Sequence, residues 1–218
     1  MTRGTADTVP GTRADDSGFE DICRLNWRGL NGHELIDVAW AYYYFSVQFR
    51  ENVQIARALY PDDERLRELA EGECDTDNLS PWPGVAAAGE RMNHDEFMRR
   101  SLALSAVDDA RRQRLESVGH RYLGRVRALD SKSRALSLAS YENGGLVAVF
   151  RAMLKAPVWD NPVLEAFRHF LNEHIGLDAD PENGHGALCR HLVPDAQVNF
   201  LWQAFREALI EAAPRLVV

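Results

Sequence analysis

The residues best suited to chemistry lie in the segment HFLNEHIGLDADPENGHGALCRH, residues 169–191. His174 and Asp178 are four residues apart, so both point from one helix face, about 40° apart. A proline and an Asn-Gly pair interrupt the helical pattern before His185, and unwound backbone beside such side chains is costly unless a site uses it. Imidazole and carboxylate together suit iron or manganese. The segment therefore indicates a metal site; the alternative is a helix end where these groups only cap the chain.

Two other segments carry side chains of the same types. Glu142 stands next to two glycines inside an otherwise apolar helical run, LSLASYENGGLVAVF. An unpaired buried Glu costs several kcal/mol, and each glycine about 1 kcal/mol relative to Ala. A metal, or a substrate that approaches the backbone closely, would justify both; a helix kink facing solvent is the alternative. His94, in MNHDEFMRR, taken alone reads as an ordinary surface or core histidine.

These groups must be positioned by helices, because apolar residues recur at helical spacing along most of the chain. Helices are expected over 33–60, 62–73, 85–104, 107–129, 132–155, 163–177 and 196–213. Residues 74–84, CDTDNLSPWPG, read as a loop because of their prolines and Asx residues. No window alternates with period two long enough to predict a strand, and no Gly-rich nucleotide motif occurs. The fold class is therefore all-α, with about seven helices.

Length and composition narrow the class of protein. The 218 residues are 45% hydrophobic and 27% charged, which suits one domain, 19–218, behind a disordered N-terminal tail, 1–18. The net charge of −8 argues against nucleic acid as a partner. No apolar run could span a bilayer and no signal peptide is evident, so a cytoplasmic location is expected, with no membrane partner. Cys23, Cys74 and Cys189 lack the spacing of a disulfide framework or zinc site.

The order of these motifs resembles the haem-oxygenase-like diiron oxidases and oxygenases. A Glu on one helix is followed by the His of HDEF, a mid-helix Glu, then H-x3-D and a His-Gly pair. The resemblance spans about residues 35 to 192 and is strongest at FRHFLNEHIGLD and its His-Gly. It implies a seven-helix bundle that holds two iron ions, with manganese as an alternative, and that activates O2.

The resemblance implies three carboxylates and three histidines as metal ligands and catalytic residues. Carried over residue by residue, these are Glu73, His94, Glu142, His174, Asp178 and His185. The long interval from Asp178 to His185 leaves open whether His185 or another group completes the site.

The long interval from Glu73 to His94 leaves further alternatives. Glu71 or Glu90 could replace Glu73, and Glu90 lies four residues before His94. Glu51 is a candidate extra carboxylate.

Residues outside the ligand set have expected places as well. Asn143 or Tyr141 could orient the histidines. His169 is expected near the ligands or at the surface, and His120 and His191 at the surface. The aromatic side chains of the first long helix could wall an apolar cavity, although plain core is the simpler expectation for most of them.

The resemblance implies oxidation of a small amine- or carboxylate-bearing metabolite in a biosynthetic setting, with an external electron donor. The leading hypothesis is N-oxygenation of an amino-acid-like amine, because the acidic balance could receive a protonated amine. The alternative is oxidative C–C cleavage, decarboxylation or desaturation at the same two ions. The resemblance also implies a homodimer as the assembly.

Two further hypotheses use other chemistry. A haem-binding member of the fold would use His33 as axial ligand and residues 142–145 as the flexible distal segment. A thiaminase-like hydrolase would need a reactive cysteine in the pocket, but Cys74 is expected on a loop and Cys23 in the N-terminal lead, with Cys189 next to the histidine cluster.

Overall fold

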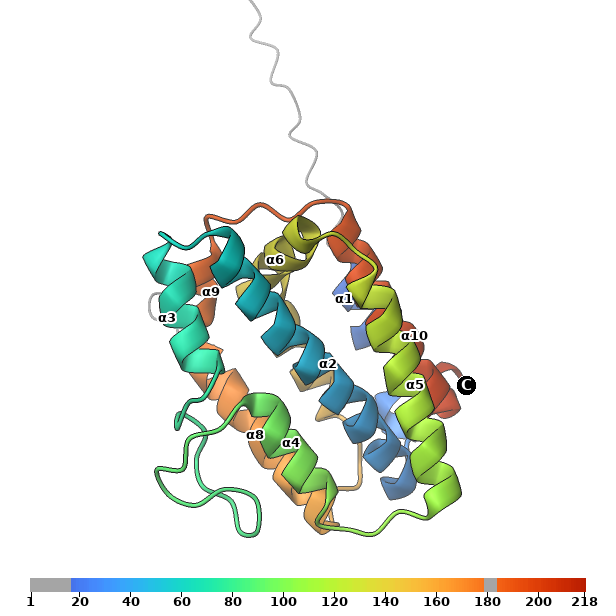
Figure 1. The fold of residues 1–218 in the computed structure, drawn as a ribbon. Helices are drawn as coiled ribbons and strands as arrows, with labels where there is room; N and C mark the ends of the chain where they lie inside the picture. The colour runs from blue at the N-terminus through green and yellow to red at the C-terminus, as the bar shows by residue number, and fades with distance from the viewer. Residues whose placement is uncertain (1–16, 179–183) are drawn as a thin grey trace, which may run out of the picture.

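All regular structure in the described part of the chain is helical. The computed structural model describes residues 17–178 and 184–218, apart from the side chains of Ser17 and Asp178. Ten α-helices and three short turns of 3-10 or π type occur in these ranges, and no strand does (Figure 1). The all-α prediction is therefore confirmed. Most of the expected tail, residues 1–18, lies outside the described residues.

Helix α2 (Gly32–Leu59) is the centre of the molecule. It begins in a capping box, in which the Asn31 side chain accepts from the Glu34 backbone N–H and the Glu34 carboxylate accepts from the Asn31 backbone N–H. Its 28 residues match the expected helix over 33–60. Buried side chains lie on several of its faces, and α2 packs against α3, α4, α5, α6, α8 and α10.

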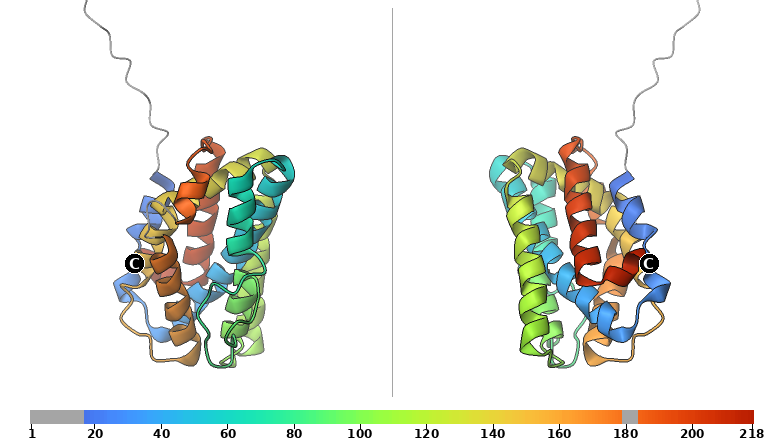
Figure 2. Two further views of the ribbon diagram at one scale, coloured as in Figure 1. Left: turned by 90° about the vertical axis from the view of Figure 1, so that its left-hand side faces the viewer. Right: turned by 90° about the vertical axis from the view of Figure 1, so that its right-hand side faces the viewer.

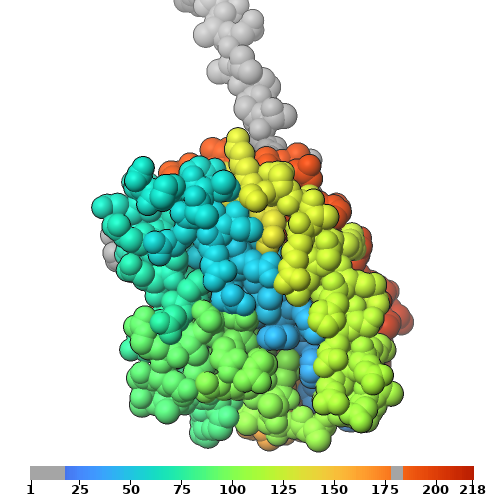
Figure 3. Space-filling view, viewed as in Figure 1, coloured from blue at the N-terminus to red at the C-terminus, as the bar shows by residue number. Residues whose placement is uncertain are grey.

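The remaining long helices surround α2 and run roughly along one direction, so the domain is a bundle (Figure 2). They are α3 (Glu64–Glu73), α4 (His94–Leu102), α5 (Asp109–Arg127), α6 (Ser131–Ser140), α7 (Leu146–Met153), α8 (Pro162–Asp178) and α10 (Gln197–Ala212). Shorter segments complete it: α1 (Ser17–Cys23), α9 (His185–Cys189), η1 (Trp27–Gly29), η2 (Tyr141–Gly145) and η3 (Pro214–Val217). On the face seen in Figure 3, α2 is visible only as a strip between its neighbours.

An aromatic core joins α2 to α10. Phe45 lies 4.4 Å from Phe205 between ring centroids, and Tyr141 meets Trp202 edge-on at 4.7 Å. Each of these four side chains is at most 1% exposed. Such contacts add to the burial free energy by about 0.5–1.5 kcal/mol per pair. They hold α2, α10 and η2 in fixed relative positions.

The prediction of a helix over 85–104 is wrong in its first half, because α4 begins only at His94. Gly84 and Gly89 have φ angles of +76° and +72°, in the left-handed region, and interrupt the short alanine run between them. Antiparallel bridges Trp82–Ala86 and Thr76–Met92 fold residues 74–93 back on themselves instead. The loop therefore extends to the residue before His94.

The continuous helix expected over 132–155 is interrupted. Helices α6 and α7 are separated by the π-helical turn η2, where Asn143 has ψ +40° and Gly144 has φ +92°. Both residues are exposed, whereas Glu142 is 5% exposed. The break therefore faces solvent, and the carboxylate faces inward.

The helix count exceeds the expected seven for two reasons. The interruption at η2 makes two helices of one, and the short helices α1 and α9 were not predicted. No helix among the described residues is long and apolar enough to cross a membrane.

Candidate metal centre

Glu73, the last residue of α3, lies at the centre of a buried group of ionisable side chains. Its Oε2 is 2.8 Å from Nδ1 of His94, and its Oε1 is 2.7 Å from Nδ1 of His185. Burial alone would raise the pKa of Glu73, but the two imidazoles outweigh it and hold this pKa well below its usual range. The carboxylate is therefore ionised and contacts one histidine with each oxygen.

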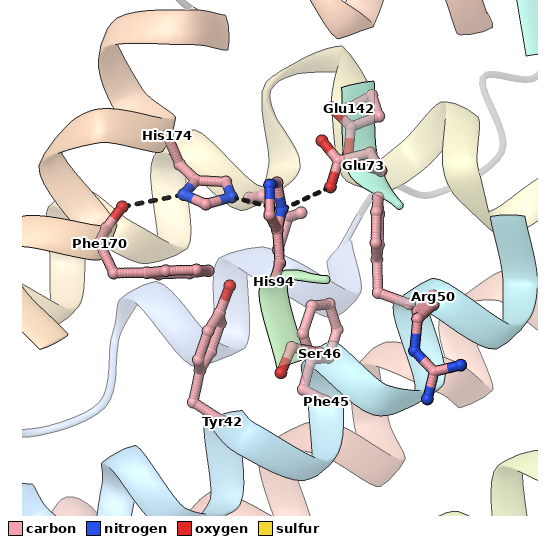
Figure 4. Close-up of a pocket in the computed structure, with 11 residues that line it drawn as sticks. Tyr42, Phe45, Ser46, Arg50, Glu73, His94, Glu142, Phe170 and His174 are labelled. Carbon is pink, nitrogen blue, oxygen red and sulfur yellow. Dashed lines mark hydrogen bonds and ion pairs between the residues drawn. The ribbon is translucent and has the colours of Figure 1, made fainter. Parts of the chain in front are cut away.

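His174 extends this group on the other side of His94. The His174 Nε2 is 3.1 Å from His94 Nδ1, the atom that also faces Glu73 (Figure 4). Ligand atoms of Glu73, His94 and His174 lie within 4.8 Å of one another, and all three residues are buried. A group of this geometry could hold a metal ion, because a carboxylate and two imidazoles converge on one point.

The protonation of His174 suits that role. Its Nδ1 lies 2.9 Å from the carbonyl oxygen of Phe170, one helical turn earlier, so Nδ1–H is assigned as the donor of that bond. Burial lowers the pKa of His174 to about 3. The ring is therefore neutral at physiological pH, with the lone pair of Nε2 directed toward His94 and Glu73.

Glu142 and His185 lie on the opposite side of Glu73. The Glu142 Oε2 is 3.7 Å from Nδ1 of His185, the atom that meets Glu73 at 2.7 Å. Glu142 comes from η2 and His185 from the start of α9. Together with Glu73 of α3, these groups are therefore supplied by three separate elements. Glu73 thus lies between two pairs of candidate ligands.

Small residues allow these elements to come close. A Cβ at Gly186 would lie 2.7 Å from the carbonyl oxygen of Glu142, and one at Gly72 would lie 3.0 Å from Nε2 of His185. The first contact is with backbone that cannot move without displacing Glu142. The His-Gly pair of the sequence is therefore explained by close packing of α9 on η2.

A small cavity adjoins the group. The space open to the centre of a water molecule is about 20 Å³, which is room for about one water. Its walls are mostly aromatic or aliphatic: Tyr42, Phe45, Phe49, Leu146 and Phe170. The Tyr42 hydroxyl points toward His94 and His174 (Figure 4). Aromatic residues of α2 thus line the cavity as well as forming core.

The structure brings together five of the six residues predicted as ligands: Glu73, His94, Glu142, His174 and His185. The sixth, Asp178, ends α8, but its side chain lies outside what the structure describes.

The alternative carboxylates lie elsewhere. Glu71 is exposed. Glu90 accepts from the Ala87 backbone N–H and pairs with Arg100 at 2.7 Å. Glu51 pairs with Arg127 and, at 2.8 Å, with Arg134. Among these candidates only Glu73 faces the histidines.

Asn143 and Tyr141 do not orient the histidines. Asn143 is exposed at the helix break. The Tyr141 hydroxyl accepts from Gln48 Nε2 at 3.4 Å, in a separate polar cluster.

The other histidines pack against neighbouring elements or lie at the surface. His169 stacks on Trp82 with ring centroids 4.7 Å apart and contacts the Ser80 carbonyl, so it fastens the loop 74–93 to α8. His120 and His191 are exposed, as expected, and His191 pairs with Asp63 at 2.6 Å. His33 is also exposed, beside Arg111, and does not line the cavity, so it does not fit an axial haem ligand.

The three cysteines are free, and none lines the cavity. Burial raises the pKa of Cys74 to about 11, with a further contribution from Glu73, and burial also raises the pKa of Cys23. A higher pKa means less thiolate at neutral pH, which makes Cys74 and Cys23 poor nucleophiles. The thiaminase-like hypothesis has no support here.

Sequence reasoning missed Asn78, whose Oδ1 lies 3.1 Å from Nε2 of His94. It also missed the carbonyl of Phe170 as the partner of His174. The residue four positions before a helical histidine is a signal that could have indicated Phe170. For Asn78 the only signal in the sequence was that its segment reads as a loop.

Comparison with known proteins finds no matching family model, no matching curated protein and no matching solved structure.

Proposed function

We propose that this protein is a non-haem diiron oxygenase with a haem-oxygenase-like bundle, and that it oxidises a small amine- or amino-acid-like substrate with O2. The observation that carries the proposal is the buried convergence of Glu73, His94 and His174. Buried carboxylates are costly unless a cation or hydrogen-bond donors compensate them. His94 and His185 compensate the charge of Glu73 in the structure, one at each oxygen, and a metal ion bound by the same groups would take over that role.

The donor set fits iron or manganese. Three imidazoles and two carboxylates lie in one group, and no thiolate accompanies them in the described part of the site. Nitrogen and oxygen donors of this kind favour iron and manganese over thiolate-preferring metals. Glu73, between His94 with His174 on one side and Glu142 with His185 on the other, would be shared by two ions.

Bound iron would supply the redox chemistry that activates O2. The residues of the chain would do the rest. His94, His174 and His185 would bind as neutral imidazoles, and the Phe170 carbonyl holds the His174 ring by its Nδ1–H. The aromatic wall of Tyr42, Phe45, Phe49 and Phe170 would exclude water from the reacting groups. The Tyr42 hydroxyl, directed toward the histidines, would be positioned to contact a water-sized ligand in the cavity.

An anaerobic Fe(II) titration followed by exposure to O2 tests the proposal. Two equivalents of bound iron and a transient visible absorption are the expected results. Less than one equivalent bound in wild-type protein would overturn it, and one equivalent would restrict the site to a single ion. Iron binding retained in full by both His174→Ala and Glu142→Ala would mean that the site is elsewhere.

Product mass spectrometry with a panel of amino acids and amines then tests the reaction. Gain of oxygen on an intact carbon skeleton would support N-oxygenation. Loss of a carbon fragment, or of two hydrogens, would indicate oxidative cleavage or desaturation at the same ions instead. No oxidised product across the panel would remove both.

A further inference from the structure

Asn78 joins the two helices that carry Glu73 and His94. Its Nδ2 donates to the carbonyl oxygen of Gly72 at 2.6 Å, next to Glu73 at the end of α3. Its Oδ1 lies 3.1 Å from Nε2 of His94, at the start of α4. Because the donor at Gly72 must be the amide nitrogen, the orientation of the Asn78 amide is fixed, and Oδ1 is the atom that faces His94.

This orientation determines which ring atom of His94 holds a proton. Oδ1 can only accept, so His94 must donate through Nε2–H. The Nδ1 atom of His94, 2.8 Å from Glu73 and 3.1 Å from His174, is then the atom available as a ligand. The Glu73 carboxylate competes for a ring proton at Nδ1, and without Asn78 it would be the acceptor that remains; a proton on Nδ1 would block metal binding there.

We propose that Asn78 is a positioning residue that keeps the proton of His94 on Nε2 and fixes the spacing between Glu73 and His94. The part that concerns metal binding rests on the proposed function; the part that concerns the proton does not. Asparagine is suited to both bonds at once, because one amide supplies a donor for Gly72 and an acceptor for His94.

Three variants separate these roles. Asn78→Ala removes both bonds. Asn78→Asp keeps an acceptor for His94 and loses the donor to Gly72. Ser80→Ala is the matched control, because the Ser80 hydroxyl fastens the same loop to Glu173 of α8 and has no bond with His94 in the structure.

The first readout is the histidine 15N spectrum of metal-free protein. We expect a proton on Nε2 of His94 in wild-type protein, Asn78→Asp and Ser80→Ala, and a shift of that proton toward Nδ1 in Asn78→Ala. An unprotonated Nε2 in wild-type protein would overturn the proposal whether or not any metal binds.

The second readout is the affinity for Co(II), used as a spectroscopic probe. We expect Asn78→Ala to bind about 10- to 100-fold more weakly, the range for residues that orient metal-bound histidines. Ser80→Ala should stay close to wild type, and Asn78→Asp should lose less affinity than Asn78→Ala, because it keeps the acceptor for His94 and loses only the bond to Gly72. Equal losses in Asn78→Ala and Ser80→Ala, or in Asn78→Ala and Asn78→Asp, would reduce Asn78 to a loop contact and overturn the proposal. If wild-type protein binds no Co(II), the metal proposal is lost and the 15N spectra alone decide the role of Asn78.

Discussion

Two buried polar clusters lie on either side of α2, and they are built differently. In the first, which we call the arginine cluster, the Arg134 guanidinium donates to Glu51 at 2.8 Å and to Asn52 at 2.9 Å. Asn52 donates in turn to the Ser137 hydroxyl at 2.9 Å, and Ser137 donates to the Arg134 carbonyl at 2.7 Å. Each acceptor in this chain meets a donor, and the half-buried Glu51 carboxylate meets a guanidinium.

The candidate metal centre differs in the type of partner. Its Glu73 carboxylate faces two imidazoles, and His174 and His94 face each other through ring nitrogens 3.1 Å apart. The Arg50 guanidinium, which lines the cavity, is engaged by Asp95 through two bonds of 3.0 Å. A guanidinium keeps its protons at all physiological pH values, whereas an imidazole can exchange a proton for a metal ion. The type of partner that a carboxylate meets therefore distinguishes the arginine cluster from the candidate metal centre.

The largest difference between the two clusters is expected for substitutions of Glu73 and Arg134, the central charged residue of each. Glu73→Gln should lower the metal affinity more than about 100-fold, beyond the range for residues that only orient ligands. The free energy of unfolding of the metal-free protein should fall as well, because a pKa lowered by His94 and His185 means that the Glu73 carboxylate contributes stability in the folded state. Metal titration and urea unfolding measure the two effects. Unchanged metal affinity in Glu73→Gln would contradict the assignment of Glu73 as a ligand.

Arg134→Met should affect stability without affecting the metal. It leaves the buried Asn52 amide without its donor, while Glu51 keeps Arg127 as a partner, so we expect a loss of about 1 to 3 kcal/mol. Because Arg134 contacts Glu51 and Asn52 and not the candidate ligands, the metal affinity of the folded variant should stay within about twofold of wild type. A larger loss of affinity would show that the two clusters are coupled through α6 and η2.

Gly186→Ala tests the packing that brings His185 to Glu142. The added Cβ would lie 2.7 Å from the Glu142 carbonyl, so α9 must move, at a cost of about 1 to 3 kcal/mol. We expect metal affinity to fall about tenfold as His185 is displaced. Gly124→Ala is the control, because nothing lies within 4 Å of a Cβ there and a helical Gly→Ala change stabilises by up to about 1 kcal/mol. Equal metal affinity in the two variants would contradict the packing explanation.

The smallest effect concerns pH. Burial alone would raise the pKa of Glu51, but hydrogen bonds from Arg127 and Arg134 outweigh it and lower this pKa below 4.5. A lowered pKa in the folded state means that the carboxylate contributes stability above its unfolded pKa, about 4.3, and that this contribution is lost as pH falls further. Urea unfolding between pH 3 and 6 should therefore show a weaker loss of stability on acidification in Glu51→Gln than in wild type. Parallel curves for the two proteins would disprove the assignment.

Local patterns in the sequence were enough to locate most of the long helices and most of the ligand candidates. The 28-residue helix α2 and the amphipathic α10 follow from apolar spacing. Glu142 could be singled out because a carboxylate and two glycines are costly inside an apolar helical run. The helix break at η2 confirms that the run is irregular there. His94 was the weakest candidate on its own, and its place depends on contacts across the fold.

Features that depend on distant backbone were not predictable in this way. The start of α4 at His94 depends on two glycines with positive φ and on the bridge between Thr76 and Met92. Asn78 and Gly72 matter because the end of α3 meets the start of α4, and residues 74–93 between them carry only turn signals. The choice of Glu73 over Glu71 and Glu90 likewise needed the direction of each side chain, which spacing alone does not determine.

The meeting of these two helix ends has an electrostatic consequence through the backbone itself. Glu73 is the last residue of α3, where carbonyl groups give the helix a partial negative charge that disfavours another carboxylate and favours a cation. His94 is the first residue of α4, where the partial positive charge of the backbone N–H groups opposes a cation. The macrodipole of α3 therefore adds attraction for a metal ion, and the start of α4 offsets part of it.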